Sequence, residues 1–408
     1  MIKKIAINQL RPGIFVHDFN CDVKTHNLIL EPVLIKDIKI IDILNSWGIK
    51  EIYIDTDQGL DVELPKSQLE DNRQTDRALF KLAKEQPKST PSVPLGEELA
   101  VAKSIKIQAI NVINNAMNQV RAGKPLETGG AYQLIDHMDQ SIVRNRDALV
   151  LLTRIRNKDE YTMMHSISVG AYVLNFCIIN KISREKTMAL AIGALFHDIG
   201  KTKIPLEILN KPGKLTEDEF TEMKKHSLYS AEILKDSSNL PQEAYDMGLH
   251  HHERYDGKGY PHQIKGDEIS FGSQLCAVAD VYDALTSDRC YKKGIDRIEG
   301  LRKLYEWSGD HFNKEVAYQF INAIGVYPIG TCVKLESGRI GVVVGSTESA
   351  EQPVVRIFYD EKKRASVPVH DLDLFYTEDR VAQYADSDKW DLKKMNIFED
   401  LSKDLFPV

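Results

Sequence analysis

The chain has 408 residues, which at roughly 150 residues per domain predicts two or three domains, each large enough to bury a core. Hydrophobic residues make up 42% and charged residues 28%, which is typical of folded globular proteins and excludes disorder throughout. Acidic residues outnumber basic ones by 60 to 53, giving a net charge of -7, so we expect no basic face for a nucleic-acid polymer.

The sequence also indicates the compartment. No apolar stretch approaches the roughly 18 residues that span a bilayer, and the N-terminus lacks the long apolar core of a signal peptide. We therefore expect a cytoplasmic protein without a membrane span. The five cysteines are scattered without a CxxC spacing, which favours reduced, buried thiols over disulfides or a thiolate zinc site.

Residues 1–60 are predicted to form a small α/β domain with a regulatory role. The patterns are strand-like at 13–16, 28–30 and 51–55, and helical at 35–44. Residues 61–96 are polar and rich in proline, a composition that resists packing, so we expect a linker that includes at most a short helix.

Residues 97–325 have helical periodicity and are predicted to form an all-α bundle. The long candidate helices cover 97–121, 133–155, 161–179 and 184–196. The first two of these could pair two chains into a homodimer or pack on the bundle, and packing is favoured.

Residues 326–408 change to segments rich in valine, isoleucine and glycine. These segments cover 331–336, 340–345, 354–359 and 365–369, with turn signals between them. The pattern predicts a small β-rich module at the end of the chain.

Histidines and aspartates recur at regular intervals in the helical part. Intervals of 32, 29, 25 and 28 residues separate His165 from His197, His197 from His226, His226 from His251, and His252 from Asp280. One helix out and one back takes about that many residues at roughly 11–12 residues per helix, so these side chains return to one level of the bundle. Imidazoles and carboxylates that meet in this way predict a metal site with open positions.

The adjacent pair His197 and Asp198 suggests two metals. On a helix neighbouring side chains project roughly 100° apart, so the two residues can serve different ions, or Asp198 can bridge them. Two divalent ions would carry more charge than the carboxylates of Asp198 and Asp280 neutralise. The excess would bind a phosphodiester and acidify a water molecule, so hydrolysis of a phosphate ester is the predicted reaction.

Several segments carry a family resemblance. Leu195-Phe-His-Asp-Ile-Gly-Lys201 resembles the signature of the HD superfamily of metal-dependent phosphohydrolases. With His251-His-Glu-Arg-Tyr-Asp-Gly-Lys-Gly-Tyr-Pro261 and Asp280-Val-Tyr-Asp-Ala-Leu-Thr-Ser-Asp-Arg289, it resembles the HD-GYP family, cyclic di-GMP phosphodiesterases of bacterial signalling, over residues 159–325. Leu10-Arg-Pro-Gly-Ile-Phe-Val16 is similar to a small uncharacterised domain often found ahead of HD-GYP domains.

The resemblance implies a set of metal ligands that agrees with the spacing. The set is His165, His197, Asp198, His226, His251, His252 and Asp280. Some family members bind a third metal through a glutamate where Tyr161 stands here, so we expect two divalent ions per chain. Iron or manganese is the favoured metal, and nickel and other ions suit the same ligands.

The resemblance also implies residues for catalysis and substrate binding. Asp198 and Lys201 are the catalytic candidates, with Lys201 contacting the scissile phosphate, while Arg289 and Lys292 hold the phosphates and guanine of the substrate. Tyr260 is a further substrate-binding candidate, in a loop of glycines and proline that is expected to shape the rim of the site and to offer a surface for a protein partner. His250 is expected to lie outside the ligand set.

The predicted function is hydrolysis of cyclic di-GMP to linear pGpG, with GMP as a further product left open. One alternative is a phosphodiesterase for 3′3′-cyclic GMP-AMP, because exchanging one purine changes base contacts that the motifs do not report. Another is a sensor that binds cyclic di-GMP without turnover and acts through a partner. Hydrolysis of (p)ppGpp is the least supported reading.

Overall fold

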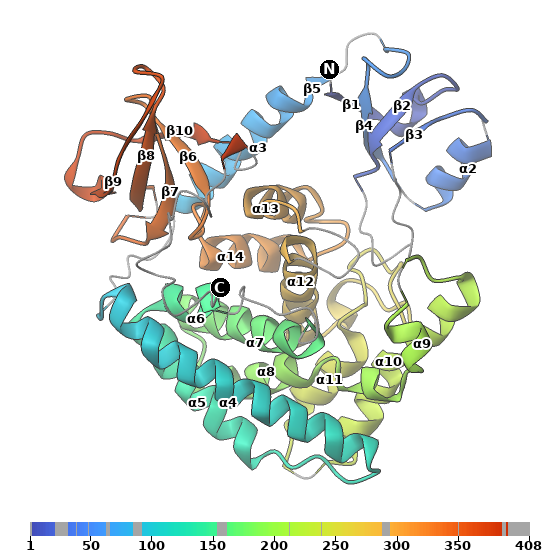
Figure 1. Ribbon diagram of the computed structural model, residues 1–408. Helices are drawn as coiled ribbons and strands as arrows, with labels where there is room; N and C mark the ends of the chain where they lie inside the picture. The colour runs from blue at the N-terminus through green and yellow to red at the C-terminus, as the bar shows by residue number, and fades with distance from the viewer. Residues whose placement is uncertain are drawn as a thin grey trace. The chain divides into compact units, whose positions relative to one another are not determined.

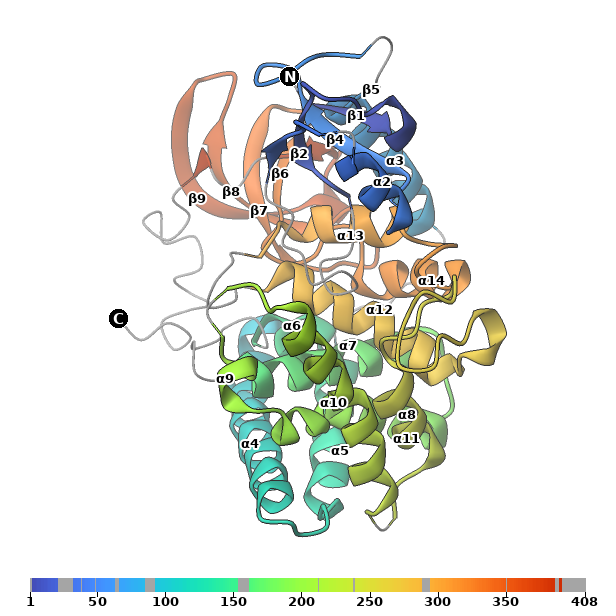
Figure 2. The ribbon, with the colours of Figure 1, turned by 90° about the vertical axis from the view of Figure 1, so that its right-hand side faces the viewer.

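A computed structural model gives the fold of the chain (Figures 1 and 2). It describes residues 2–20, 32–37, 39–47, 49–62, 66–84, 92–152, 161–211, 213–237, 239–287, 294–349, 351–385 and 389–390. The chain divides into two compact units, Met1–Leu79 with Lys211–Phe220, and Phe80–Asn210 with Thr221–Val408. Each unit is described by itself.

The smaller unit is built on a sheet with strand order β3-β2-β4-β1-β5. Its elements are β1 (Ile2–Ala6), the 3-10 turn η1 (Ile7–Gln9), β2 (Phe15–Asp18), β3 (Val33–Leu34), α2 (Lys39–Ser46), β4 (Glu51–Asp55) and β5 (Lys66–Ser67). β1 and β4 are antiparallel with Ile5 opposite Ile52, and both side chains are buried. The predicted small α/β domain is confirmed.

Some boundaries in this unit differ from the sequence patterns. The expected helix at 35–44 begins only at Lys39, because the backbone of Ile35 bonds in both directions to the segment before β2, donating to Ile14 and accepting from Gly13. The Asp37 carboxylate then accepts the Lys39 N–H at 3.0 Å and starts the helix. β1 was not predicted, and the expected strand at 28–30 lies outside the described residues. Helix α3 (Gln68–Lys84) occupies part of the expected linker.

The larger unit contains the helical region. Its long helices are α4 (Leu95–Arg121), α5 (Gly129–Arg144), α7 (Tyr161–Ile179), α8 (Arg184–Phe196), α10 (Glu217–Lys235), α12 (Phe271–Thr286) and α14 (Lys314–Ile324), and its shorter elements are α6 (Arg146–Leu152), η3 (Ile199–Lys203), α9 (Leu206–Leu209), α11 (Gln242–His250), η4 (Gly266–Glu268) and α13 (Arg297–Glu306). α4 and α5 lie side by side and pack on α7 (Figures 1 and 2). This packing agrees with the favoured prediction for these two helices.

The helix expected at 133–155 is in fact two helices, so that prediction was wrong. α5 ends at Arg144, and Asn145 has an extended backbone with φ -156° and ψ 101°. The Asn145 side chain donates to the carbonyl of Val93 at 2.9 Å and accepts the N–H of Asp147 at 3.1 Å, which ends one helix and begins the next. α7 and α8 have the predicted bounds.

The larger unit ends in a five-stranded antiparallel sheet with strand order β10-β6-β7-β8-β9. The strands are β6 (Cys332–Leu335), β7 (Arg339–Gly345), β8 (Val354–Asp360), β9 (Ala365–Asp373) and β10 (Val381–Tyr384), with η5 (Leu374–Tyr376) before the last. Cys332, Val342 and Phe358 form its core, and β10 was not predicted. The predicted fold class, a small α/β domain, an all-α bundle and a β-rich module, is confirmed.

The predictions on membrane spans and on cysteines can also be compared with the structure. Within them, no helix is long and apolar enough to cross a bilayer. Cys177, Cys276 and Cys332 are buried, as expected.

Candidate metal centre

The predicted ligands come from five places in the helical region. They are His165 on α7, His197 at the C-terminal end of α8 with Asp198 next to it, His226 on α10, His251 and His252 directly after α11, and Asp280 on α12. All are buried except His252, whose side chain is 10% exposed. Side chains that are 115 residues apart in the sequence, from 165 to 280, therefore meet inside the bundle.

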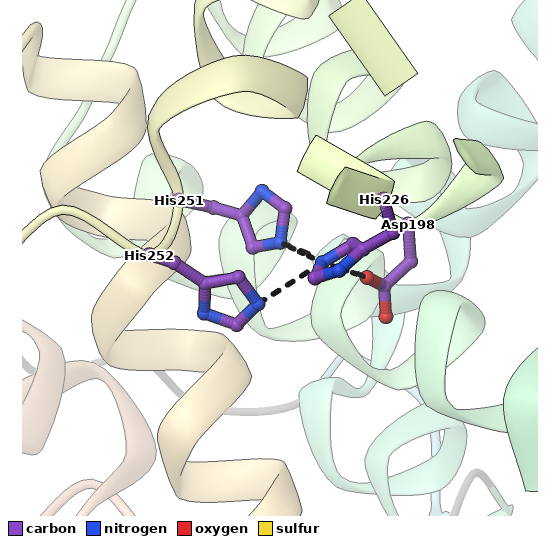
Figure 3. Close-up of side chains that lie close together, drawn as sticks. All are labelled: Asp198, His226, His251 and His252. Atoms are coloured by element: carbon purple, nitrogen blue, oxygen red, sulfur yellow. Dashed lines mark hydrogen bonds and ion pairs between the residues drawn. The ribbon is translucent and has the colours of Figure 1, made fainter. Parts of the chain in front are cut away.

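These side chains form two clusters, and within each cluster the ligand atoms all lie within 4.8 Å of one another. One cluster contains Asp198, His226, His251 and His252, and Figure 3 shows its imidazoles turned toward one another around His226. The other contains His165, His197 and Asp280, with His165 Nε2 at 2.8 Å from Asp280 Oδ1. The whole predicted ligand set is thus brought together.

Asp198 lies between the two clusters. Its Oδ1 is 3.3 Å from His226 Nε2 and 3.6 Å from His251 Nε2. Its Oδ2 is 3.3 Å from His197 Nε2 and 3.6 Å from His165 Nε2. Because each carboxylate oxygen faces a different cluster, Asp198 has the position of a ligand that bridges two ions.

The Nδ1 atoms of four histidines are fixed by hydrogen bonds that point away from the clusters. The Nδ1–H groups of His197, His226 and His251 donate to the backbone carbonyls of Ala194 at 2.7 Å, Met223 at 2.6 Å and Met247 at 2.9 Å, and that of His165 donates to the Asp283 carboxylate at 2.6 Å. Carbonyls and carboxylates only accept, so the proton lies on Nδ1. The neutral ring then directs its Nε2 lone pair into the centre, as a metal ligand requires.

The short distances between these lone pairs indicate whether a cation fits between the imidazoles. His226 Nε2 and His251 Nε2 are only 3.3 Å apart although both rings carry their proton on Nδ1. Two acceptors at this distance repel one another unless a positive charge is present. Among the described residues, His197 Nε2 and Asp198 Oδ1 are also buried without a hydrogen bond. The two clusters therefore fit a dinuclear metal site.

Burial and the neighbouring charges shift the pKa values of the groups in the centre. Burial lowers the pKa of His226 to about 3 and also lowers the pKa of His251, so both rings stay neutral. Burial alone would raise the pKa of Asp198, but the Lys201 ammonium and His197 hold it well below its usual range. Burial opposes protonation of His197 as well, yet the carboxylates of Asp198 and Asp280 raise its pKa.

Asp283 is a residue of this centre that the sequence reasoning did not identify. It is fully buried on α12, one turn after Asp280, and it accepts the hydrogen bond that orients His165. The spacing of Asp280 and Asp283 was a usable sequence signal, because residues at positions i and i+3 of a helix lie on the same face. Asp283 holds the ring and does not face the clusters through any ligand atom of its own.

Two other predicted residues lie at the more accessible side of the centre. The ammonium group of Lys201, in η3, is paired with Asp198 Oδ2, and its side chain is 21% exposed. The ring of Tyr260 lies over His252 with centroids 4.6 Å apart. Arg289 and Lys292 lie outside the described residues.

The loop that contains Tyr260 is fastened to the histidine pair. The buried Glu253 carboxylate accepts the backbone N–H groups of His262 at 2.7 Å and Gln263 at 3.0 Å. At Gly259, a Cβ atom would lie 2.4 Å from the backbone nitrogen of Arg254, so only glycine fits this close approach. His250 bonds His262 at 3.1 Å through Nε2 and lies outside both clusters.

Comparisons with known proteins agree with this metal centre. The model of the HD domain matches residues 137–316, and that of a domain of unknown function (DUF3391) matches residues 2–131. The chain is 34% identical to the cyclic di-GMP phosphodiesterase PA4108 of Pseudomonas aeruginosa over 97% of this chain and 95% of that protein. The chain belongs to the HD-GYP family.

Other phosphodiesterases match a shorter part of this chain. The cyclic di-GMP phosphodiesterase response regulator RpfG of Xanthomonas campestris is 38% identical over 44% of this chain and 48% of its own. The 3′3′-cGAMP-specific phosphodiesterase 2 of Vibrio cholerae is 33% identical over 41% of this chain and 32% of its own. The resemblance inferred from the HD and GYP segments is confirmed, as is the small domain ahead of them.

Proposed function

We propose that this chain is a metal-dependent phosphodiesterase that hydrolyses cyclic di-GMP to linear pGpG. One observation carries the proposal: two buried clusters of histidine and aspartate share Asp198 in a chain that aligns almost end to end with a cyclic di-GMP phosphodiesterase. The catalytic domain we assign to residues 97–325, between a regulatory domain at 1–60 with its linker at 61–96 and a β-rich module at 326–408.

We assign the seven residues of the two clusters as ligands of two ions. Iron or manganese suits this mixture of imidazole and carboxylate, and nickel is accepted by the same donors. Such ions supply Lewis-acid stabilisation of phosphoryl oxygens and acidify a water molecule. The chain itself fixes the tautomer of His165, His197, His226 and His251 through their Nδ1 hydrogen bonds, so the Nε2 atoms of these four rings face the centre.

The remaining residues act on the substrate. Lys201 provides a cation beside Asp198, where it stabilises charge that develops on the scissile phosphate. Tyr260 and His252 form a partly exposed edge of the centre against which the dinucleotide packs. Arg289 and Lys292 are proposed to hold the second phosphate and a guanine, since a guanidinium fork suits a dianionic ligand.

The loop around Tyr260 is also proposed as a surface for a protein partner. Support for the loop is its rigidity: Glu253 fixes two successive backbone N–H groups of it. A fixed surface loses little conformational entropy on binding.

The function is tested by purifying the full chain without oxygen, measuring its metals, and incubating it with cyclic di-GMP and 3′3′-cyclic GMP-AMP in parallel. We expect two ions per chain and pGpG from the first substrate, with turnover lost in Asp198→Ala while the fold is kept. A preference for cyclic GMP-AMP would move the chain to the second activity. Binding of cyclic di-GMP without product, with metal present, would make it a sensor, and a metal-free protein would overturn the mechanism.

A further inference from the structure

A polar cavity lies in the larger unit, between the helical region and the C-terminal sheet. Its volume is about 40 Å³, and Arg146, Asn175 and Arg297 line it together with Ser346 from the loop after β7. None of the described residues of the two metal clusters lines it. The cavity is therefore separate from the proposed catalytic centre.

Arg297 brings a buried positive charge to this cavity. The residue, at the start of α13, is 8% exposed, and its Nη1 donates to the carbonyl of Ile329. Among the described residues, its Nη2 is buried without a hydrogen bond, so no carboxylate accepts from that nitrogen. A charge removed from water without a counter-ion is unfavourable, so the site calls for an anion.

Asn175 adds a second unfilled group. This α7 residue is 3% exposed, and its Nδ2 donates to the carbonyl of Ala323 at 2.7 Å, which fixes the orientation of the amide. Its Oδ1 is buried without a hydrogen bond among the described residues. The cavity thus offers a buried acceptor as well as a buried cationic donor, and a ligand that presents both an anionic oxygen and an O–H group satisfies both.

Arg146 supplies a second guanidinium. Its Nη2 donates to Ser346 Oγ at 3.3 Å, and its Nε is 3.9 Å from Asp147 Oδ1. Asp147 is shared, because its Oδ2 also accepts the Ser346 N–H at 3.1 Å. Two guanidiniums against one shared carboxylate leave the lining of the cavity positively charged.

We propose that this cavity binds a small protonated oxyanion, hydrogen phosphate or the terminal phosphate of a phosphomonoester. Phosphate oxygens accept from Arg297 Nη2 and Arg146, and the P–O–H group donates to Asn175 Oδ1. A water molecule needs roughly 10–15 Å³ of such volume, so about 40 Å³ holds roughly three to four oxygen-sized groups, which matches the oxygens of a phosphoryl group or of hydrogen phosphate. A carboxylate shares the anionic oxygens but lacks the O–H donor.

The test is equilibrium binding of radiolabelled inorganic phosphate to the full chain, before and after removal of metal by a chelator, with circular dichroism to verify the fold. We expect one component that persists without metal. Arg146→Gln and Arg297→Met should weaken it about tenfold or more, because each removes a charge-assisted hydrogen bond. Arg297→Lys should restore part of it. Arg302→Met is the matched control, since Arg302 is on the same helix but pairs with Glu299 and does not line the cavity.

Competition identifies the source of the anion. GMP that displaces phosphate from the chelated protein supports a phosphomonoester, and displacement by phosphate alone supports the free ion. Stronger displacement by acetate than by either would overturn the proposal in favour of a carboxylate site. Two other results would show that the cavity holds only water and would also overturn the proposal. One is phosphate binding that disappears with the metal, and the other is phosphate binding that is equal in the three cavity variants and the control.

Discussion

At the scale of single residues, the centre depends on hydrogen bonds that its ligands make on their far side. His165 differs from the other three fixed imidazoles because its Nδ1–H meets a carboxylate, Asp283, and not a backbone carbonyl. A carboxylate partner raises the basicity of the ring and fixes its tautomer. Such a partner can be changed without removing any ligand.

Asp283→Asn is therefore expected to weaken metal binding by roughly 10- to 100-fold, with a parallel loss of turnover. Competition with a chelator of known affinity measures the first effect directly. Asp379→Asn is the matched control, because it removes a carboxylate that pairs with Arg339 in the C-terminal sheet and should leave metal affinity unchanged. Equal metal affinity in wild type and Asp283→Asn would show that the bond to His165 is only structural.

Lys201 allows charge stabilisation to be separated from metal binding. Its ammonium contacts Asp198 but offers no ligand atom, so Lys201→Met should keep the metal content of the protein. We expect kcat to fall by about 10²- to 10³-fold, the usual effect of removing one group that stabilises developing charge. Metal analysis together with steady-state kinetics checks this. An unchanged kcat would exclude the proposed role, and a loss of metal would show that Lys201 mainly supports Asp198.

Burial determines the reactivity of Cys177. Its position inside α7 raises the pKa of the thiol to about 12, so almost none of it is thiolate near pH 8. We expect Cys177 to resist iodoacetamide in the folded chain at pH 8 and to react fully in denaturant, as measured by mass spectrometry of its peptide. Rapid labelling of the native chain would mean that α7 opens locally.

At the scale of elements, the centre requires η3 and α10 to approach very closely. Gly200 is the residue at their contact: its N–H donates to Ser230 Oγ at 2.9 Å, and a Cβ there would lie 2.1 Å from the carbonyl oxygen of His226. The glycine of the His-Asp-Ile-Gly-Lys motif thus has a packing reason. It lets the backbone after Asp198 touch the backbone that carries His226.

Gly200→Ala is expected to push the two elements apart, to lower the melting temperature, and to reduce metal content. Gly129→Ala is the matched control, because a Cβ at Gly129 meets nothing within 4 Å and lies in the first turn of α5. The control should melt at the same temperature or slightly higher, since alanine favours helix over glycine. Thermal unfolding and metal analysis of both variants check the prediction. Normal metal content in Gly200→Ala would mean that the contact can relax without moving His226.

The elements also show how far the sequence alone could lead. Helical periodicity was sufficient for α7, α8 and the spacing of the ligands, because these depend on signals repeated within each helix. The break at Asn145 depends on a bond to Val93, 52 residues away, and the role of Asp283 depends on His165, 118 residues away. Local patterns do not encode contacts of that range: the i, i+3 spacing places Asp283 on the same helix face as Asp280 but does not show that it meets His165. β1 escaped notice for a related reason, since its stability comes from pairing with β4.

At the scale of the whole molecule, the metal centre connects helices that come from distant parts of the sequence. Ligands from α7, α10, α12 and the segments after α8 and α11 converge on it, so bound ions link most of the helical region. Without ions, the lone pairs of His226 and His251 face one another at 3.3 Å. Binding to the folded chain alone stabilises it by about 4 kcal/mol at a ligand concentration roughly 1,000 times the dissociation constant.

We therefore expect removal of metal to lower the melting temperature of the helical region by roughly 10 °C, given that about 1 kcal/mol shifts it by 2–4 °C in domains of this size. Calorimetry of the full chain with and without chelator, followed by readdition of manganese, measures the shift and its reversal. His226→Ala is the control, because it removes a ligand and one of the repelling nitrogens together. Its melting temperature should depend less on metal than that of the wild-type chain, because the cluster of His165, His197 and Asp280 stays intact. Identical melting of the wild-type chain with and without metal would show that packing alone organises the ligands, and that the ions contribute to chemistry but not to the fold.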